Sequence, residues 1–557
     1  MWSLASRWLR SITLKRLFPG ECSMENKNTI IAIVLMAVVW LGFTFFFKPS
    51  PPVVAPEVGQ HQEAAPKVVE KKVTQQPVAA PVPTADLAPP VNEQLINVEN
   101  DYLRLQISSS GARIKHVELK QYRVSADIDA APVVLHPNGP LRTATLKTTG
   151  REGLSVPVDA NFQLLSGEKN INLKPGQTAD LVFRYVDQAN GLQVDKVFHF
   201  NGDNYQFDMN YQVKNISNLN KSGVLQLSLI QPWDEKLHSS RYDFIGPVTY
   251  TGKDLETDKV KKLAEQIKSY QQPVWSGFET KYFISAAAPL GNSIEKVTVS
   301  KEGELIENTF SSTYFNIAPQ ATAQIGVNFY FGPRDSEILK QAGHQFDKAI
   351  DLGFFAVIAS PLRYVLKFFY GFVGNYGVSI ILLTVIIKLI FWPLTQKSYT
   401  SMKEMQKIQP EMAKIREKFK NDKERMNKEI MALYKDKRVN PLGGCLPMVI
   451  QIPVFFALYR VLMVDIALRH APFVFWLQDL SAKDPYYITP VIMGVTMFIQ
   501  QKMTPSTMDP KQAKMFMMMP VVFTFLFLNF PSGLVVYWLT NNLLTIGQQY
   551  MIHRKPS

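Results

Sequence analysis

Apolar residues are concentrated in one run near the start of the chain and in several runs beyond residue 350. The first run, TIIAIVLMAVVWLGFTFFF at 29–47, has the length that crosses a bilayer about 30 Å thick at about 1.5 Å per residue. Later runs of similar character occupy 375–395, 445–464, 486–502, 515–530 and 532–550. This pattern predicts an α-helical membrane protein with six crossings, in which the turn FPSG joins the last two.

Residues 95–345 follow a different pattern, the alternation with period two that is typical of strands. In VFHFNGDNYQFDMNYQVKN, the apolar residues that share one strand face are Tyr205, Phe207, Met209, Tyr211 and Val213. The preceding Asn201 and Gly202 suit a tight hairpin turn. Both cysteines, Cys22 and Cys445, lie outside this region, which excludes a disulfide framework there. We expect an all-β domain of two packed sheets.

Three further segments have no crossing or strand pattern. Residues 48–94 are rich in Pro and Ala and predict an extended linker. At 346–373, basic residues stand among aromatic ones, which predicts an amphipathic helix along the outer membrane surface. Residues 1–28 precede the first crossing, and MENKNTI begins at Met24, so 1–23 are expected to be an upstream-start extension.

The distribution of basic residues predicts the orientation of these crossings. The net charge is +13, and much of the excess lies beside apolar runs, which favours membrane orientation over DNA binding. Residues 396–440 hold 13 Lys and Arg against 7 Asp and Glu. The positive-inside rule therefore places 396–444, the loop 503–514, the tail 551–557 and the N-terminus in the cytoplasm. The loop 465–485 and the β domain then lie on the outer face.

Lys388 lies inside the second crossing, VSIILLTVIIKLIFWPLT. An ammonium at the centre of a membrane helix costs roughly 2.5–3.5 kcal/mol on insertion scales. One interpretation is snorkelling, because Lys388 lies about 13 Å from the cytoplasmic end of the helix. The other interpretation is a cation that faces a water-filled groove between the helices.

Polar residues in the crossings favour the groove. Thr384 lies four residues before Lys388, on the same helical face. Polar or amphipathic residues of the other crossings include Gln451, Thr496, Gln500, Thr524, Tyr537, Trp538, Asn541 and Asn542. Individually, such residues also serve as hydrogen-bonding contacts between helices. Because the predicted crossings contain no Asp or Glu, the lysine is suited to a transient anionic guest, such as an acidic segment of another chain.

The basic loop at 396–444 also has helical periodicity. Apolar residues recur in steps of three and four, and a KND turn separates two such stripes, which predicts a helical hairpin bent at Pro410. The hairpin is either a solvated spacer or a docking surface for acidic partners and RNA. The candidate docking residues are Met402, Lys403, Met405, Lys407, Met412, Arg416 and Lys418.

Motifs for catalysis and for metal or nucleotide binding are absent from the sequence. It contains no H-E-x-x-H, no glycine-rich phosphate loop with Lys-Ser/Thr, and no G-x-S-x-G. Ser379 lies more than two helical turns from Lys388, which disfavours a serine–lysine protease. We therefore expect no enzymatic activity, no catalytic residue, no metal and no cofactor. A solute transporter with Lys388 as an anion site, or an envelope-assembly scaffold, remains an alternative.

Four segments carry a resemblance to a known family: PLTQKSYTSMKEMQKIQPEM, VNPLGGCLPMVIQIPVFFALY, DLSAKDPYYITPVIMGVTMF and FPSGLVVYWLTNNLLTI. Together with the first crossing and the large outer domain, they resemble the Gram-negative form of the YidC/Oxa/Alb family of membrane protein insertases. The resemblance implies a five-helix insertase core in the bacterial inner membrane, with a hydrophilic groove open to cytoplasm and lipid. It also implies a periplasmic β-supersandwich domain.

The same resemblance implies roles for particular residues and partners. Lys388 stands where the family usually has arginine. Substrate-contacting positions correspond to the neighbourhoods of Ile452 and Met517, and Trp538 corresponds to an aromatic residue that lines the groove. The implied function is to insert, fold and help assemble inner-membrane proteins, alone or with the Sec translocon. Implied partners are nascent membrane proteins, the lipid bilayer and, through the cytoplasmic loops, the ribosome and the signal-recognition-particle receptor.

Overall fold

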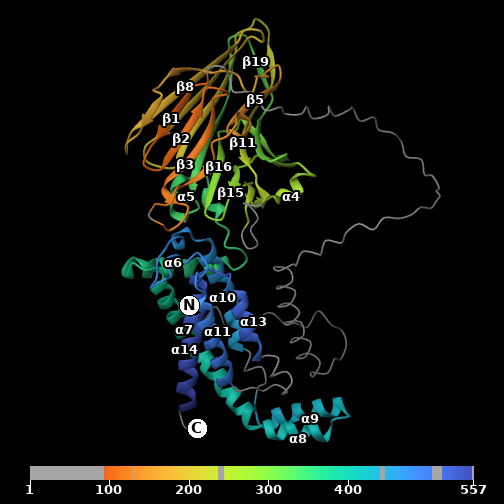
Figure 1. Ribbon diagram of the computed structural model, residues 1–557. Helices are drawn as coiled ribbons and strands as arrows, with labels where there is room; N and C mark the ends of the chain where they lie inside the picture. Colours follow the sequence, from red (N-terminus) through yellow and green to blue (C-terminus); the bar gives the residue numbers. More distant parts are fainter. Residues whose placement is uncertain (1–92, 128, 236–243, 440–445, 505–516, 555–557) are drawn as a thin grey trace, which may run out of the picture. The chain divides into compact units, whose positions relative to one another are not determined.

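A computed structural model describes residues 93–127, 129–235, 244–439, 446–504 and 517–554 (Figure 1). The predicted first crossing at 29–47 and nearly all of the predicted linker lie outside the described residues. The described residues form three regions, each with its own apolar core: a β domain, a helical bundle and a helical hairpin.

The strands of the β domain pair into three sheets, whereas the alternation pattern led us to expect two. The first has the order β4 (Pro132–His136), β3 (Arg113–Arg123), β2 (Leu103–Ser108), β1 (Leu95–Glu99), β7 (Asn170–Asn172). The second has the order β13 (Leu255–Thr257), β12 (Gly246–Tyr250), β15 (Trp275–Glu279), β16 (Phe283–Leu290), β20 (Thr322–Pro333), β10 (Gln206–Asn215), β9 (Leu192–Asn201), β8 (Thr178–Asp187), β6 (Gln163–Ser166). The third has the order β14 (Lys268–Gln271), β17 (Ile294–Glu302), β18 (Leu305–Ser312), β11 (Lys221–Pro232), β19 (Phe315–Ile317), with β5 (Lys147–Glu152) also paired to β11. The short helices of this region are η1 (Leu141–Thr143), α4 (Val260–Leu263), α5 (Ser336–Ala342) and η2 (Phe346–Ala349).

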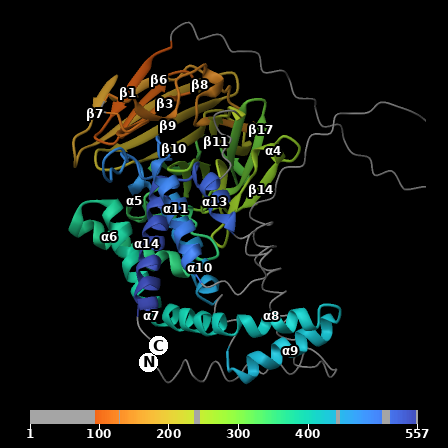
Figure 2. The same ribbon diagram turned by 60° about the horizontal axis from the view of Figure 1, so that its bottom comes forward.

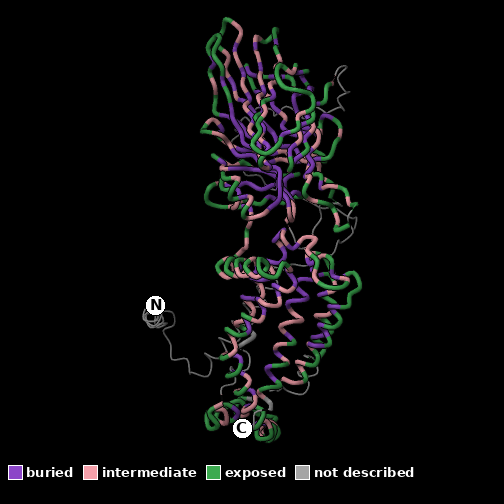
Figure 3. The backbone as a smooth tube through the Cα atoms, turned by 90° about the vertical axis from the view of Figure 1, so that its left-hand side faces the viewer, coloured by how far each residue is buried: buried purple, intermediate pink, exposed green. Residues whose placement is uncertain are grey.

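The alternation in β10 has the expected structural effect. The five apolar residues from Tyr205, just before the strand, to Val213 are all buried, and the residues between them are partly exposed. Strand β9 precedes it in an antiparallel hairpin, as expected. Gly202 lies in the connection because a Cβ atom there would be 2.1 Å from the Lys174 carbonyl oxygen. Figure 3 shows buried backbone, in purple, along the strands of this domain.

Helices occupy the ranges in which the sequence predicted the second to sixth crossings. The bundle consists of α6 (Ala356–Val373), α7 (Tyr376–Lys407), α10 (Leu446–Val464), η4 (Ile466–Leu468), α11 (Ile488–Met503), α13 (Met519–Phe527) and α14 (Ser532–Arg554). Among the described residues, α6 and α7 are long and apolar enough to cross a membrane by the criteria of length and composition. Helix α14 packs against α7 and α11, and α13 packs against α11.

Local polar contacts determine where the bundle helices begin. Asn375 caps α7, because its side-chain oxygen accepts a hydrogen bond from the Val378 amide at 3.1 Å. The first amides of α14, at Ser532 and Gly533, donate to backbone carbonyls of the 480–482 loop. Residues 528–531 connect α13 to α14, and Ser532 and Gly533 of the FPSG segment already belong to α14.

A buried ion pair joins α6 to the end of α10. Arg363 Nε lies 2.8 Å from Asp465 Oδ2, and both side chains are largely buried. Asp465 also accepts a hydrogen bond from the Ala467 amide and so caps η4. The opposite side of α6 exposes apolar and aromatic residues, including Val357, Tyr364, Phe368 and Phe372. The predicted position of this helix on the membrane surface stays a prediction.

The helical hairpin contains α8 (Gln409–Lys418) and α9 (Lys423–Asp436), which lie side by side in Figures 1 and 2. Its first arm begins within α7, which continues to Lys407 instead of ending near 395. The helix breaks at Ile408, and Pro410 stands in the first turn of α8, where a proline is tolerated. A second proline, Pro393, lies inside α7 between Lys388 and the hairpin.

His136 in β4 gives a testable dependence of stability on pH. Burial lowers the pKa of His136 to about 4, below its ordinary value of 6.5. As the pH falls, the imidazole in the unfolded chain takes up a proton at a higher pH than the buried imidazole does. The folded state therefore loses stability relative to the unfolded state between about pH 6.5 and pH 4. Between pH 7.5 and pH 5, we expect the free energy of unfolding of the β domain to fall by about 2 kcal/mol more in the wild type than in His136→Gln. Thermal unfolding at the two pH values measures this difference, and equal slopes would contradict the assignment.

Candidate functional site

Lys388 is buried in the bundle, and its ammonium is directed toward α14. The Nζ atom donates to Thr545 Oγ1 at 2.7 Å and to Asn541 Oδ1 at 3.4 Å. Only 8% of the residue is exposed. In the described part of the chain, no carboxylate lies within salt-bridge distance of this ammonium. The cation is therefore stabilised by neutral oxygen atoms alone.

A third helix contributes to the same network. Gln451 of α10 donates from Nε2 to Asn541 Oδ1 at 2.9 Å. Asn541 Oδ1 thus accepts from two donors that come from different helices. We call Lys388, Gln451, Asn541 and Thr545 the polar centre; it joins α7, α10 and α14.

Polar residues continue along α14 beyond the polar centre. Asn542, Gln548 and Gln549 are buried, as is Thr545 of the polar centre itself. Gln549 Nε2 donates to Tyr399 of α7 at 2.7 Å and to Thr504, just after α11, at 2.9 Å. The sequence analysis missed Thr545, Gln548 and Gln549. The spacing of 541, 545 and 548 along a helix is the signal that identifies this stripe.

Several predicted groove residues lie near the polar centre in sequence but have other contacts. The Thr384 hydroxyl donates to the Ile380 carbonyl at 2.6 Å, within its own helix. Trp538 contacts Phe455 of α10 edge to face, with 4.8 Å between ring centroids. Tyr537 is buried and stacks on the same phenylalanine. Ile452, beside Gln451, is half-buried. An aromatic cluster therefore packs between α10 and α14.

Two further predicted groove residues, Thr524 and Met517, have no contact with the polar centre among the contacts described. Thr524 lies in α13 and packs against Gly494 of α11; its hydroxyl donates to the Pro520 carbonyl at 2.7 Å. Met517 is 43% exposed. The structure gives neither residue a hydrogen bond or ring contact to Lys388. Their roles as substrate contacts therefore stay predictions.

The candidate docking residues of the hairpin divide into two groups. Met402, Met405 and Met412 are buried. Met405 and Met412 form a core with Ile408 and Ile430. The basic candidates are at least partly exposed: Lys403, Lys407, Arg416 and Lys418. Among these candidates, the basic side chains are therefore the ones accessible to a partner, while Met405 and Met412 pack in the core between the two arms.

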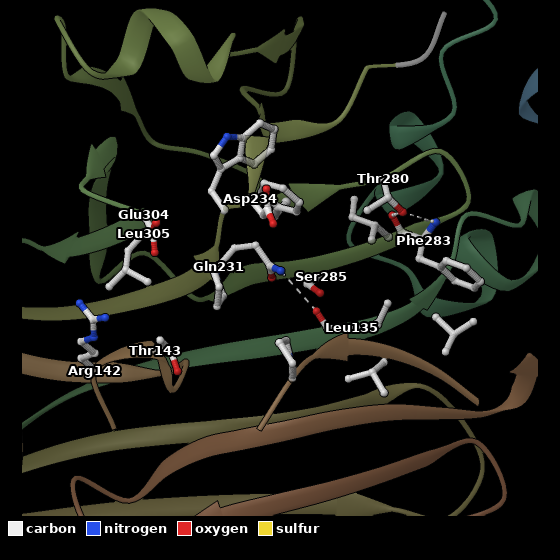
Figure 4. Close-up of a pocket in the computed structure, with 17 residues that line it drawn as sticks. Leu135, Arg142, Thr143, Gln231, Asp234, Thr280, Phe283, Ser285, Glu304 and Leu305 are labelled. Carbon is white, nitrogen blue, oxygen red and sulfur yellow. Dashed lines mark hydrogen bonds between the residues drawn. The ribbon is translucent and has the colours of Figure 1, made fainter. Parts of the chain in front are cut away.

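The β domain contains a cavity of about 430 Å³ (Figure 4). Apolar residues of β4 and β16, such as Val133 and Ile284, form much of its lining. The charged residues at the cavity, Arg142, Asp234 and Glu304, are exposed to solvent. This cavity thus differs from the polar centre, where the charge is buried. Throughout the described ranges, we find no group of three acidic, histidine or cysteine residues placed to hold a metal ion.

Comparison with known proteins identifies relatives of the whole chain. Residues 95–365 match the protein-family model described as YidC periplasmic domain, and residues 368–557 match the one described as 60Kd inner membrane protein. The membrane protein insertase YidC of Geobacter metallireducens is 44% identical, over 95% of this chain and 98% of that protein. The protein of the same name from Geobacter sulfurreducens is 45% identical, over 96% of this chain and 99% of that protein. The alignment with a crystal structure of an active YidC insertase covers 82% of this chain and 93% of the insertase chain, with 18% sequence identity and a TM-score of 0.37.

The contact between α11 and α13 gives a prediction for Thr524. A Cβ atom on Gly494 would lie 2.0 Å from Thr524 Oγ1, so Gly494→Ala forces the two helices apart. We expect this substitution to destabilise the bundle by about 1–3 kcal/mol, measured as a lower thermal unfolding temperature in detergent. Adding Thr524→Ala removes the clashing oxygen and is expected to restore most of the loss. An unchanged unfolding temperature for Gly494→Ala alone would contradict the close approach.

Proposed function

The chain belongs to the YidC family of membrane protein insertases, and on this premise we propose that its polar centre receives acidic segments of client proteins during insertion. The activity is the insertion of membrane proteins and not an enzymatic reaction. Membership of this family favours the insertase function over the two alternatives considered from the sequence, a solute transporter and an envelope-assembly scaffold. The observation that carries the proposal is the burial of Lys388 among neutral acceptors, with no carboxylate partner among the described residues.

The physical basis is the free energy of a buried charge. Neutral oxygen atoms solvate the Lys388 ammonium but leave its charge uncompensated. A carboxylate on an entering client supplies the missing opposite charge, and the pair is stronger away from bulk water. The apolar segment of the client then leaves for lipid, driven by burial of about 25 cal/mol per Å². When the client leaves, the Lys388 ammonium is again without a carboxylate partner and can bind the next client, whereas a fixed acidic residue would stay paired with it.

The surroundings of the polar centre suit such a client. Gln451 and Thr384 lie on the helices that contribute to it, and the aromatic side chains of Tyr537 and Trp538 provide an apolar wall on α14. We propose that clients enter a hydrophilic groove from the cytoplasm and also contact Ile452, Thr524 and Met517. The protein is an inner-membrane protein with a periplasmic β domain. Six crossings, with both termini in the cytoplasm, complete the proposed topology.

The hairpin is the proposed docking surface for the machinery that delivers clients. Its partly exposed cations, among them Lys403, Lys407 and Arg416, suit an acidic receptor or ribosomal RNA. The ribosome and the signal-recognition-particle receptor are the proposed cytoplasmic partners. The Sec translocon is proposed as a partner in the membrane for a subset of clients.

Substitution of Lys388 tests the role of its charge. We expect Lys388→Ala in proteoliposomes to reduce insertion of a client with an Asp-containing translocated tail by about tenfold, because a charged hydrogen bond contributes about 1.5–3 kcal/mol. Lys388→Arg keeps the charge and is expected to retain most of the activity. The measurement is protease protection of the translocated tail.

The control client carries Asn in place of each Asp in the tail. Its insertion should respond little to Lys388→Ala, because it offers no negative charge to the ammonium. Equal activity of the wild type, Lys388→Arg and Lys388→Ala on the acidic client would overturn the proposed role of the charge.

Neutralising the hairpin tests docking. We expect joint replacement of Lys403, Lys407, Arg416 and Lys418 by Gln to weaken co-sedimentation with ribosomes and to lower its dependence on salt. The thermal stability of the bundle should stay the same. Joint replacement of the exposed Glu411 and Glu417 by Gln is the matched control, which should not weaken binding. Ribosome binding that is unchanged in the basic variant would leave the hairpin as a solvated spacer.

A further inference from the structure

The Thr545 hydroxyl can act only as a hydrogen-bond acceptor toward Lys388. This hydroxyl has one proton, and this proton is donated to the Asn541 backbone carbonyl at 2.6 Å. Toward Lys388 Nζ, which is 2.7 Å away, the oxygen can therefore only accept. The acceptor is oriented by its own helix before any client arrives.

Asn541 is oriented in a similar way, by a different helix. The Gln451 amide donates to Asn541 Oδ1, so this oxygen and not the amide nitrogen faces the polar centre. The same oxygen lies 3.4 Å from Lys388 Nζ. Residues 541 and 545 are one turn apart on α14, so both acceptors meet the ammonium from the same helix face.

These two acceptors leave one donor of the ammonium available. A lysine ammonium has three N–H groups, and the described residues supply two acceptors to Lys388. A lysine side chain is flexible, so without fixed acceptors its charge has no defined position. Thr545, at the shorter distance, is the stronger of the two restraints.

We propose that Thr545 is a positioning residue: it holds the Lys388 ammonium so that the third N–H group meets a carboxylate of the client. This inference rests on the proposed function and adds to it the residue that determines where the charge stands. Preference for acidic clients then depends on the uncharged hydroxyl of Thr545, a residue that was not among those predicted from the sequence.

The test compares Thr545→Val, which keeps the shape and removes the hydroxyl, with Thr545→Ser, which keeps the hydroxyl. Thr545→Val should reduce insertion of the Asp-tail client by about tenfold and leave the Asn-tail client unchanged, because only the first client uses the positioned charge. Thr545→Ser should retain insertion of both clients. In the Lys388→Ala background, Thr545→Val should cause no further loss, because the two residues act through one interaction.

Thr395→Val is the matched control for loss of a buried hydroxyl. Thr395 lies on α7, is buried, and donates to the Phe391 carbonyl at 2.9 Å, as Thr545 donates to Asn541. The control should leave the ratio of the two clients unchanged. It also shows how much insertion is lost through packing alone.

Three outcomes would overturn the inference. If Thr545→Val reduces both clients equally, Thr545 acts in packing and not in positioning. If Lys388→Ala reduces the acidic client but Thr545→Val resembles Thr395→Val, the ammonium is positioned by other groups, and the proposed function stands without this residue. If Lys388→Ala itself has no effect on the acidic client, the proposed function fails and the inference fails with it.

Discussion

The candidate site depends on the positive charge of Lys388, which is buried among neutral oxygen atoms. An ammonium removed from water requires hydrogen-bond acceptors, and the structure supplies them from Thr545 and Asn541. These contacts lie where α7 meets α14, and Gln451 of α10 donates to the same Asn541 oxygen. The same hydrogen bonds thus connect α7, α10 and α14 and form the candidate site.

A second buried charge in the same bundle shows the contrast. Arg363 is paired directly with Asp465, at 2.8 Å, where α6 meets the end of α10. That pair is complete, and removal of either member would leave an uncompensated charge in a buried place. The bundle therefore contains one cation, Arg363, that is paired with a carboxylate and another, Lys388, whose described acceptors are neutral. The first holds α6 to the end of α10, and the second joins α7 to α14 through neutral oxygen atoms.

The sequence predicted those features that depend on local pattern. Alternation identified the buried face of β10, and the position of Lys388 within an apolar run identified the central residue of the site. Pairing between distant strands is not encoded in alternation. Strand β11 pairs with β5, β18 and β19, and this pairing forms the third sheet that we did not expect.

Side-chain partners were predicted less well than helices. Thr524 and Thr545 are both threonines within apolar runs, yet one packs against a glycine of α11 and the other binds the lysine. Periodicity places a residue on a face of its own helix but does not determine which neighbour that face meets. The methionines of the hairpin are a similar case, because an apolar stripe predicts burial as readily as docking.

Pro393 gives α7 a mechanical property that follows from its position. A proline inside a helix removes one backbone hydrogen bond, and its ring crowds the carbonyl four residues earlier, so the helix is weakest at that point. The proline lies between Lys388 and the end of α7 that leads into the helical hairpin. Bending of α7 at this point would change the direction of the segment that leads into the hairpin, while the turns before Pro393 keep Lys388 in contact with α14.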